Sequence, residues 1–374
     1  MSHVKILLKR LAERKEKLYT ASIMKLFTPG PIAMDPETLA IGGKQAQYFR
    51  TPAFSSLMLE CESMLKEVLD APKDTRMIFL TAAGTAAMEA SVINLFTTQD
   101  KVIVINGGTF GKRFKQICKV HQIPFESIDL EWNEQFNPRL LDKYENSGIT
   151  GMLVNMCETS TGQLYPMDVI SSFCRRNKVC LVVDSISAFL CDPFSMKETG
   201  ADAVIISSQK GLALHPGMSF VAVTKESFEK RCEKNNPSSL YFNFVDCEKD
   251  MKRGQTPFTP AVAIINQLHE KLCRIIRDGV NYHVEYIMNL ADYFRNELST
   301  KTQFTIPKYT LSNSVTPVYC PEKNAQEIIA NLIEKHDIYV TPCAGDLADF
   351  LIRVAHMSRQ ITRQDIDQLI LLLK

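Results

Sequence analysis

One lysine of this sequence stands where a predicted buried strand meets a polar turn. Residues 203–206 are apolar, and the polar segment 207–210, which ends in Lys210, follows them directly. A lysine among small and hydroxylated neighbours is suited to imine chemistry with a carbonyl compound, because desolvation shifts its pKa readily. The same segment also fits a surface lysine in a strand-to-helix turn. The role of Lys210 therefore depends on the rest of the chain.

A carboxylate, Asp184, closes an earlier apolar run at residues 179–183. A buried carboxylate needs a cationic partner or several hydrogen-bond donors, and a protonated pyridine nitrogen is one such cation. Asp184 and Lys210 are separated by about one crossover of a parallel sheet, so both can face the same end of it. Together they predict a pyridoxal phosphate enzyme, in which Lys210 forms an imine and later moves a proton, and Asp184 keeps the ring nitrogen protonated.

Small and hydroxylated residues follow other predicted strands. Residues 81–87 open a helix, so the backbone N–H groups around Gly84 and Thr85 can hold a phosphate with the helix dipole, although a small-residue turn alone is common. Ser207 or Gln209 would also bind the phosphate. Phe110 can lie flat on an aromatic ring, or it can simply pack at the start of a helix.

The elements that must position these side chains alternate between strand and helix. An amphipathic helix is expected at 54–69. Strands are then predicted at 77–80, 102–105, 125–130, 152–156, 179–183, 204–206 and 219–223, and helices at 84–95, 110–121, 138–145 and 167–177. This alternation predicts an α/β fold with a mostly parallel sheet covered on both faces, in which ligands lie beyond the carboxyl ends of the strands.

The remaining segments predict three parts of the chain. Residues 1–24 read as an amphipathic arm, residues 25–275 as the large domain and residues 276–374 as a smaller α+β domain. A long helix at 262–298 would cross between the two domains. The small domain is built from predicted strands at 315–319, 339–340 and 350–354 and helices at 325–335 and after Thr362, which stands at capping distance from Asp365.

Composition bounds the partners and the compartment. The 374 residues contain 43 basic and 42 acidic side chains, so bulk charge gives no reason to expect a nucleic acid or a membrane partner. The eleven cysteines include no C-x-x-C pair, which argues against a disulfide framework or a zinc site and for a reducing compartment. We therefore expect a cytoplasmic protein without a bound metal.

Six motifs occur in the order of one known family. The chain resembles the class V, fold-type I aminotransferases, the group of alanine:glyoxylate, serine:pyruvate and 2-aminoethylphosphonate:pyruvate transaminases. The matching segments are TPGP at 28–31, AGTAAME at 83–89, ETSTG at 158–162, VDS at 183–185, SSQK at 207–210 and RVAHM at 353–357. The chain departs from the family at Ala82-Ala83, where serine and glycine are frequent, and at Phe110, where tryptophan or histidine is more usual.

The resemblance implies a role for each matching residue. It implies that Lys210 is the Schiff-base lysine, Asp184 the pyridinium partner and Arg353 the residue that binds the substrate carboxylate, for which its bidentate fork is suited. It implies further cofactor contacts through Gly84, Thr85, Phe110, Thr159 and Gln209, and a substrate contact at Gly30. Thr259 matches a threonine that reaches the phosphate in the other subunit, which implies a homodimer with shared sites.

The substrates stay open at this stage. The segments around Arg50 and 254–260 favour 2-aminoethylphosphonate as donor with pyruvate as acceptor, and L-alanine or L-serine with glyoxylate or pyruvate is close behind. Arg50 or Arg253 would then meet the phosphonate, although both also fit surface arginines. A lyase or decarboxylase on the same scaffold is an alternative. So is a cysteine desulfurase, for which Cys343 is the candidate persulfide carrier.

Overall fold

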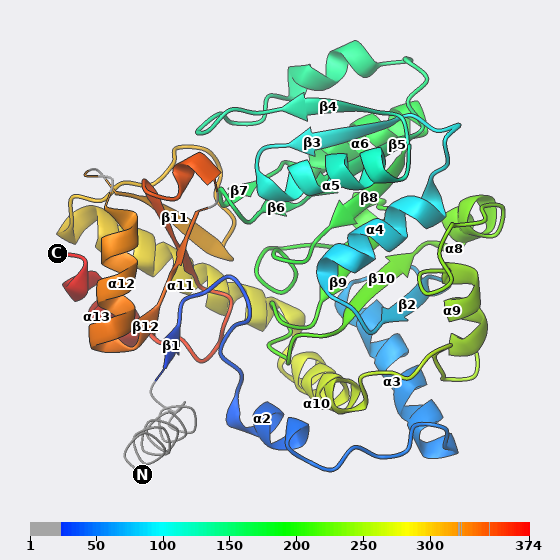
Figure 1. Ribbon diagram of the computed structural model, residues 1–374, viewed down its shortest axis with the longest axis horizontal. Helices are drawn as coiled ribbons and strands as arrows, with labels where there is room; N and C mark the ends of the chain where they lie inside the picture. Colours follow the sequence, from blue (N-terminus) through cyan, green and yellow to red (C-terminus); the bar gives the residue numbers. More distant parts are fainter. Residues whose placement is uncertain (1–23, 321, 323, 344) are drawn as a thin grey trace, which may run out of the picture.

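The computed structural model describes residues 24–320, 322, 324–343 and 345–374, so nearly all of the predicted N-terminal arm lies outside the described residues. Within the described residues, seven strands form the central sheet in the order β2-β10-β9-β8-β5-β3-β4 (Figure 1). These strands are β2 (Arg76–Leu80), β3 (Val102–Asn106), β4 (Phe125–Asp129), β5 (Gly151–Asn155), β8 (Cys180–Asp184), β9 (Ala203–Ser207) and β10 (Ser219–Val223).

The sheet is parallel except at β10, which pairs antiparallel with both β2 and β9. The parallel pairing of β8 with β9 sets Val183 opposite Val204, so the carboxyl ends of the two strands lie at the same edge. Asp184 and Ser207 are the last residues of these strands. The predicted α/β fold with its mostly parallel sheet is thus confirmed, and the polar strand ends meet as expected.

Both faces of the sheet are covered because its strand residues alternate between two hydrophobic cores. Met77 and Phe79 belong to one core, whereas Ile78 and Leu80 belong to the other. The first core also contains residues of α3 (Pro52–Val68), α6 (Met167–Asn177) and α10 (Val262–Asp278), and the second contains residues of α4 (Gly84–Leu95), α5 (Thr109–Val120) and α9 (Phe244–Met251). Figure 1 shows α4 and α5 in front of the sheet and α6 behind it.

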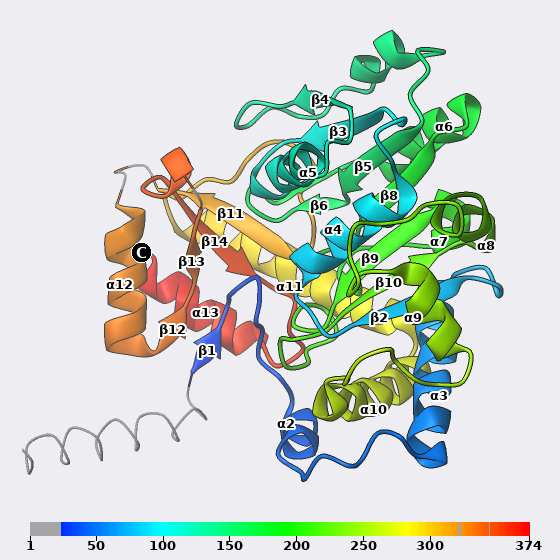
Figure 2. The same cartoon turned by 45° about the vertical axis from the view of Figure 1, so that its right-hand side comes forward.

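A second, smaller part contains its own core, which includes Phe27, Phe294, Val318 and Leu369. Its elements are β11 (Val315–Tyr319), β13 (Thr341–Pro342) and β14 (Leu351–Ala355) in one sheet, β1 (Lys25–Leu26) and β12 (Ile338–Tyr339) in another, and helices α11 (Val280–Lys301), α12 (Ala325–His336) and α13 (Arg363–Leu372). The helix α11 contributes Leu290, Phe294 and Leu298 to this core and lies next to β11 in both views (Figures 1 and 2). The predicted cap of α13 is present, because Thr362 and Asp365 bond reciprocally. The domain boundary at residue 275 stays a prediction.

Two predicted helices differ in the structure. The helix expected at 262–298 is wrong as one element, because Gly279 divides it into α10 and α11. Gly279 has a φ of +88°, which side-chain-bearing residues rarely adopt, and an apolar pattern that continues across the glycine hides this break. The segment expected to be helical at 138–145 is the 3-10 helix η1 (Pro138–Tyr144).

The remaining elements connect these parts. They are α2 (Pro36–Gly42), β6 (Cys157–Glu158), β7 (Gln163–Leu164), α7 (Met196–Thr199), α8 (Lys225–Ser227), η2 (Phe228–Cys232) and η3 (Gly345–Leu347). Among the helices of the described residues, none is long and apolar enough to cross a membrane.

Candidate active site

Lys210 lies one turn beyond the end of β9, with only 9% of the residue exposed. Its Nζ donates a hydrogen bond to Ser187 Oγ at 3.2 Å. Burial lowers the pKa of the Lys210 amine to about 8, because the charged form loses its hydration. A neutral amine is therefore accessible near physiological pH, as imine chemistry and proton transfer require.

Gly30 packs against the aliphatic stem of Lys210. A Cβ atom placed on Gly30 would lie 3.0 Å from Lys210 Cδ, and the φ of Gly30 is +125°. Only glycine adopts this backbone conformation without strain. The structure thus brings the predicted substrate-binding glycine next to the predicted Schiff-base lysine, and it explains why this position carries no side chain.

Asp184 is a buried carboxylate at the end of β8. One of its oxygens accepts the Ile186 N–H at 2.9 Å, and the other accepts the side-chain amide of Asn155. Burial raises the pKa of Asp184 to about 6, against the opposing effects of these two hydrogen bonds and of the Lys210 charge. Among the described residues no lysine or arginine forms an ion pair with it, so a protonated ring nitrogen would supply a cation that this carboxylate lacks.

The residues at the start of α4 fit a phosphate group. The N-cap residue of this helix, Ala83, makes no side-chain capping bond, so the first N–H groups of the helix are available to an anion. A Cβ on Gly84 would lie 2.6 Å from Ile186 Cδ1 and 3.4 Å from Ser207 Cβ, which shows how closely α4 approaches the ends of β8 and β9. Ser207 Oγ donates to Gln209 Oε1 at 2.6 Å. Four of the predicted cofactor-binding positions, Gly84, Asp184, Ser207 and Gln209, therefore surround one edge of the sheet.

A second observation supports the fit of a pyridine ring beside Asp184. The buried side-chain oxygen of Asn155, whose amide contacts Asp184, has no hydrogen-bond partner in the described part of the chain. Unpaired buried polar atoms are uncommon and mark sites completed by another group. The donor set, the buried carboxyl group and this open acceptor together fit pyridoxal phosphate.

Arg113, which the sequence did not single out, contacts both Phe110 and Thr85. The guanidinium carbon of Arg113 lies 4.7 Å from the centre of the Phe110 ring, and Arg113 Nη1 donates to Thr85 Oγ1 at 2.9 Å. Phe110 and Arg113 are three positions apart on α5, which puts them on one helix face. That spacing is the signal in the sequence that could have identified Arg113.

The turn at residues 158–162 holds the start of α5. The buried carboxylate of Glu158 accepts the N–H groups of Phe110 and Gly111 at 3.1 and 2.9 Å, where the helix dipole favours negative charge. Ser160 Oγ donates to Glu158 and accepts the Thr109 N–H at 2.9 Å. The motif that contains the predicted cofactor contact Thr159 thus also fixes the helix that carries Phe110.

The same turn also supports Arg353. The carbonyl oxygen of Thr159 accepts Arg353 Nη1 at 3.2 Å, and that of Pro342 accepts Nε at 3.0 Å. No partner of Arg353 Nη2 is found among the described residues, so this nitrogen remains available for a substrate carboxylate. Thr159 Oγ1 lies 2.5 Å from Ser187 Oγ, which in turn accepts from Lys210. Thr159 thus connects the two residues, because its hydroxyl group contacts Ser187, the partner of Lys210, and its carbonyl oxygen accepts from Arg353.

Three other predicted residues lie away from this cluster. Thr259 is exposed, and no contact found in the described residues joins it to the start of α4, so its contact with a partner's phosphate stays a prediction. Arg50 donates to Gln255 Oε1, and Arg253 is paired with Asp250. Among the described residues, no contact is found between either arginine and Lys210.

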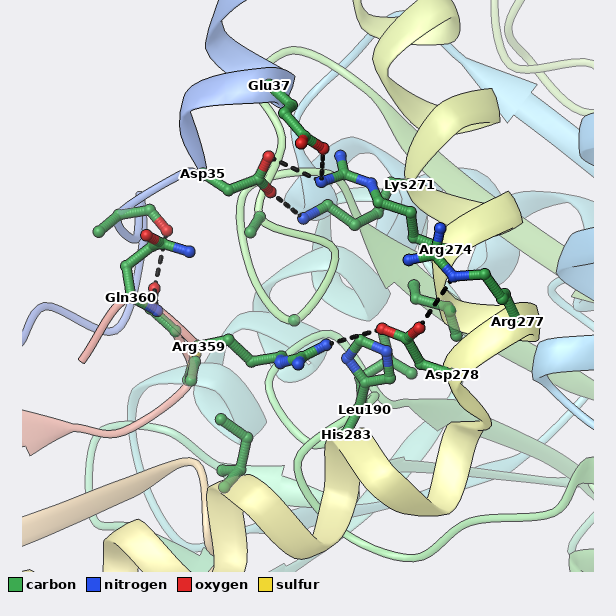
Figure 3. A pocket seen from close by; sticks show the side chains of 17 residues that line it. Asp35, Glu37, Leu190, Lys271, Arg274, Arg277, Asp278, His283, Arg359 and Gln360 are labelled. Carbon is green, nitrogen blue, oxygen red and sulfur yellow. Dashed lines mark hydrogen bonds and ion pairs between the residues drawn. The ribbon is translucent and has the colours of Figure 1, made fainter. Parts of the chain in front are cut away.

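A cavity of about 310 Å³ lies near Gly211 but is lined by different charged groups (Figure 3). In Figure 3, Asp35 of the α2 N-terminus faces Lys271 and Arg274 of α10, with which it forms ion pairs. Asp278 likewise pairs with Arg277 and Arg359. Because the carboxylates of this lining are already engaged in ion pairs, we assign the cavity as a polar junction between α2, α10 and α11 and not as the catalytic centre.

Comparison with known sequences identifies one family. The sequence profile of the family described as Aminotransferase class-V matches residues 42–369. An uncharacterised aminotransferase of Methanocaldococcus jannaschii is 28% identical over 89% of this chain and 87% of its own length. A 2-aminoethylphosphonate–pyruvate transaminase of Pseudomonas fluorescens is 30% identical over 68% of this chain and 69% of its own length.

Solved structures share the fold. The crystal structure of an alanine–glyoxylate aminotransferase from Nostoc superposes with a TM-score of 0.88 at 24% identity, covering 94% of each chain. This likeness extends over both the central sheet and the smaller part of the molecule.

Proposed function

The chain belongs to the class-V aminotransferases, and on that premise we propose that it moves an amino group from a small amino donor to pyruvate or glyoxylate. As a member of this family it is an aminotransferase whose cofactor is pyridoxal phosphate. We favour 2-aminoethylphosphonate as the donor, because a relative that is 30% identical is named for that substrate. L-Alanine and L-serine are the next candidates.

The site residues have distinct parts in this proposal. Pyridoxal phosphate supplies the aldehyde that takes up the amino group and the ring that withdraws electrons from the reacting carbon. Lys210 accepts and returns a proton at Nζ, since its lowered pKa makes the neutral amine available. Asp184 provides the negative charge that keeps a ring nitrogen protonated, and Arg353 Nη2 binds the carboxylate of an acceptor such as pyruvate.

One observation carries the proposal. Lys210 donates to Ser187, Ser187 contacts the Thr159 hydroxyl, and the Thr159 carbonyl accepts from Arg353. The proposed base, Lys210, and the proposed carboxylate-binding residue, Arg353, are therefore connected through Ser187 and Thr159. Amino transfer to a 2-oxo acid requires a base beside the reacting carbon and a cation beside the adjacent carboxylate, and this arrangement suits both needs.

The proposal is tested by a donor screen with the purified enzyme. Pyruvate and glyoxylate are offered with 2-aminoethylphosphonate, L-alanine or L-serine, omitting the pairs in which donor and product coincide, and the amino acid formed is measured. We expect alanine from pyruvate with 2-aminoethylphosphonate, and no product with the Lys210→Ala variant. If the cofactor never acquires an amino group from any donor, the transaminase proposal fails and a lyase or decarboxylase is favoured.

The desulfurase alternative finds no support at Cys343. A persulfide carrier must be able to move its sulfur to the substrate, whereas Cys343 is buried and its thiol donates to the Ser160 carbonyl at 2.9 Å. Burial of this kind favours a packing role. We therefore retain amino transfer as the proposed reaction.

We also propose a cytoplasmic homodimer with shared active sites. Thr259 is exposed next to Phe258, whose ring stacks on Tyr241 at 4.9 Å with both rings partly exposed. Such an exposed aromatic pair beside the predicted partner-contacting threonine suits a subunit interface. No disulfide bond joins any of the cysteines in the described residues, which suits a reducing compartment. Light scattering of the purified protein tests the dimer.

A further inference from the structure

We propose that Arg113 binds the phosphate group of the cofactor and supplies the positive charge that the predicted phosphate site otherwise lacks. The inference rests on the proposed position of the phosphate at the start of α4. The sequence motifs assign the phosphate to Gly84, Thr85, Ser207 and Gln209, none of which is charged. Arg113 lies on a different helix, α5, and contacts one of these four residues by donating a hydrogen bond to Thr85.

A cation would improve the charge balance of the phosphate site. A phosphate monoester carries about −1.5 to −2 charges near neutral pH. The N-terminus of α4 provides about half a positive charge, and hydroxyl and amide groups provide only dipoles. Among the side-chain hydrogen bonds of these four residues in the described part of the chain, one involves a cation. That cation is Arg113, which donates to Thr85.

Arg113 also differs in its pairing from Lys115, another cation of α5. Lys115 forms an ion pair with Asp129 at 2.6 Å, whereas Arg113 forms none with any described acidic residue. One N–H group of the Arg113 guanidinium is used on Thr85 Oγ1, and the others have no hydrogen-bond partner among the described residues. A half-buried guanidinium with unused donors and no acidic partner is suited to a phosphate oxygen.

The Phe110 ring holds the guanidinium in place. The two groups are 4.7 Å apart, and stacking on an aromatic ring restricts the orientation of the guanidinium plane. Because Glu158 in turn fixes the backbone of Phe110, the position of Arg113 is determined by the same helix start that carries the predicted ring-stacking residue. One helix thus supplies both a ring contact and a phosphate contact.

The test compares two ligands that differ only in the phosphate. Full-length protein freed of cofactor is titrated with pyridoxal phosphate and, separately, with pyridoxal, and binding is measured by equilibrium dialysis for wild type, Arg113→Gln and Arg113→Lys. Charge-assisted hydrogen bonds of this kind correspond to about a 10- to 100-fold change in affinity. We expect that loss for Arg113→Gln with pyridoxal phosphate, no change with pyridoxal, and a smaller loss for Arg113→Lys.

Two control variants make the outcomes distinct. Lys112→Gln removes an exposed charge from the same helix and is expected to leave both affinities unchanged. Thr85→Val tests the phosphate position itself and is expected to weaken only pyridoxal phosphate. Equal losses for both ligands in Arg113→Gln would show that Arg113 only supports Phe110, and no loss would exclude it from the site, so either result overturns the inference. If Thr85→Val also leaves the ratio of the two affinities unchanged, the proposed phosphate position fails as well.

Discussion

The hydroxyl oxygen of Ser187 lies 3.2 Å from Nζ of Lys210 and accepts its hydrogen bond. The charged groups that act on this amine come from several elements: Asp184 favours its protonated form, as would thiolates at Cys157 and Cys191, and Arg353 disfavours it. Ser187 is the residue that contacts the amine directly among those described. It therefore holds the nitrogen in place whenever the amine is free.

Replacing Ser187 by alanine is expected to lower the plateau rate of amino transfer about 10-fold, because the Lys210 amine loses the contact that positions it. The ammonium form of Lys210 loses its acceptor, so its pKa falls further below the present value of about 8. Because the neutral amine is the active form, the acid limb of the pH–rate profile moves to lower pH. The measurement is the single-turnover rate from the amine-loaded enzyme to pyruvate between pH 6 and 9.

Two serine variants serve as controls for that experiment. Ser187→Thr keeps the hydroxyl group and is expected to keep the position of the acid limb. Ser185→Ala removes another buried hydroxyl from the same segment, one that contacts Met156 and not Lys210. A Ser187→Ala enzyme with reduced activity but an unmoved limb would argue against direct contact with the amine.

Asp184→Asn is expected to stabilise the cofactor-free protein above pH 6. The pKa of Asp184 is about 6 when folded and near its ordinary value of 3.8 when unfolded, so folding is penalised once the unfolded carboxyl ionises. Below pH 3.8 both states are neutral and the variant has no advantage. The advantage grows between pH 4 and 6 and levels off at about 3 kcal/mol, since one pKa unit corresponds to about 1.4 kcal/mol.

Denaturant unfolding of the cofactor-free protein at several pH values measures this effect. Asp192→Asn is the matched control, because Asp192 is also buried and its pKa is also raised to about 6. Both variants are expected to gain stability, but only Asp184→Asn should lose transaminase activity. An Asp184→Asn enzyme that retains full activity would contradict the role of the carboxylate beside the ring.

Arg353→Gln is expected to raise the KM for pyruvate about 10- to 100-fold, because a charge-assisted hydrogen bond to the carboxylate is lost. Arg353→Lys should recover only part of this loss, since arginine contacts Pro342 and Thr159 through two nitrogens and presents a third, whereas lysine has one nitrogen and no planar fork. Steady-state kinetics with pyruvate as the varied substrate checks the prediction. An unchanged KM in both variants would place the carboxylate elsewhere.

Gly30→Ala is expected to impair both stability and the position of Lys210. The φ of +125° costs an alanine about 1–3 kcal/mol, and the new Cβ would lie 3.0 Å from Lys210 Cδ. Gly148→Ala separates the two effects, because Gly148 also has a positive φ but nothing lies within 4 Å of its Cβ position. Both variants should unfold at lower denaturant concentration, whereas only Gly30→Ala should lower kcat.

Residues that follow strands were accessible to sequence reasoning. Apolar runs that end in a polar side chain identified Lys210 and Asp184, because strand length and the parallel arrangement together put such residues at one edge. Ser187 was missed because it lies in an irregular segment after β8, where no periodicity predicts which side chain turns toward the lysine. The pairing of Arg113 with Thr85 was missed for a related reason, since it joins two helices whose relative position no local pattern gives.

The break at Gly279 shows another limit. The apolar positions on either side of it continue the same helical spacing, so the pattern gives one helix. The tertiary fold instead uses a positive φ there to redirect the chain from the sheet to the smaller part. Glycine is compatible with both outcomes, and the choice between them depends on packing partners that are distant in the sequence.

The turn at residues 158–162 constrains which substitutions could change the amino donor of this enzyme. Glu158 holds the helix of Phe110, and the next residue, Thr159, holds Arg353. A substitution that shifts this backbone would change cofactor orientation and carboxylate binding together, so its effects should be strongly non-additive with changes elsewhere in the site. New amino donors would then be accommodated by substitutions in other walls of the pocket, which leave this turn unchanged.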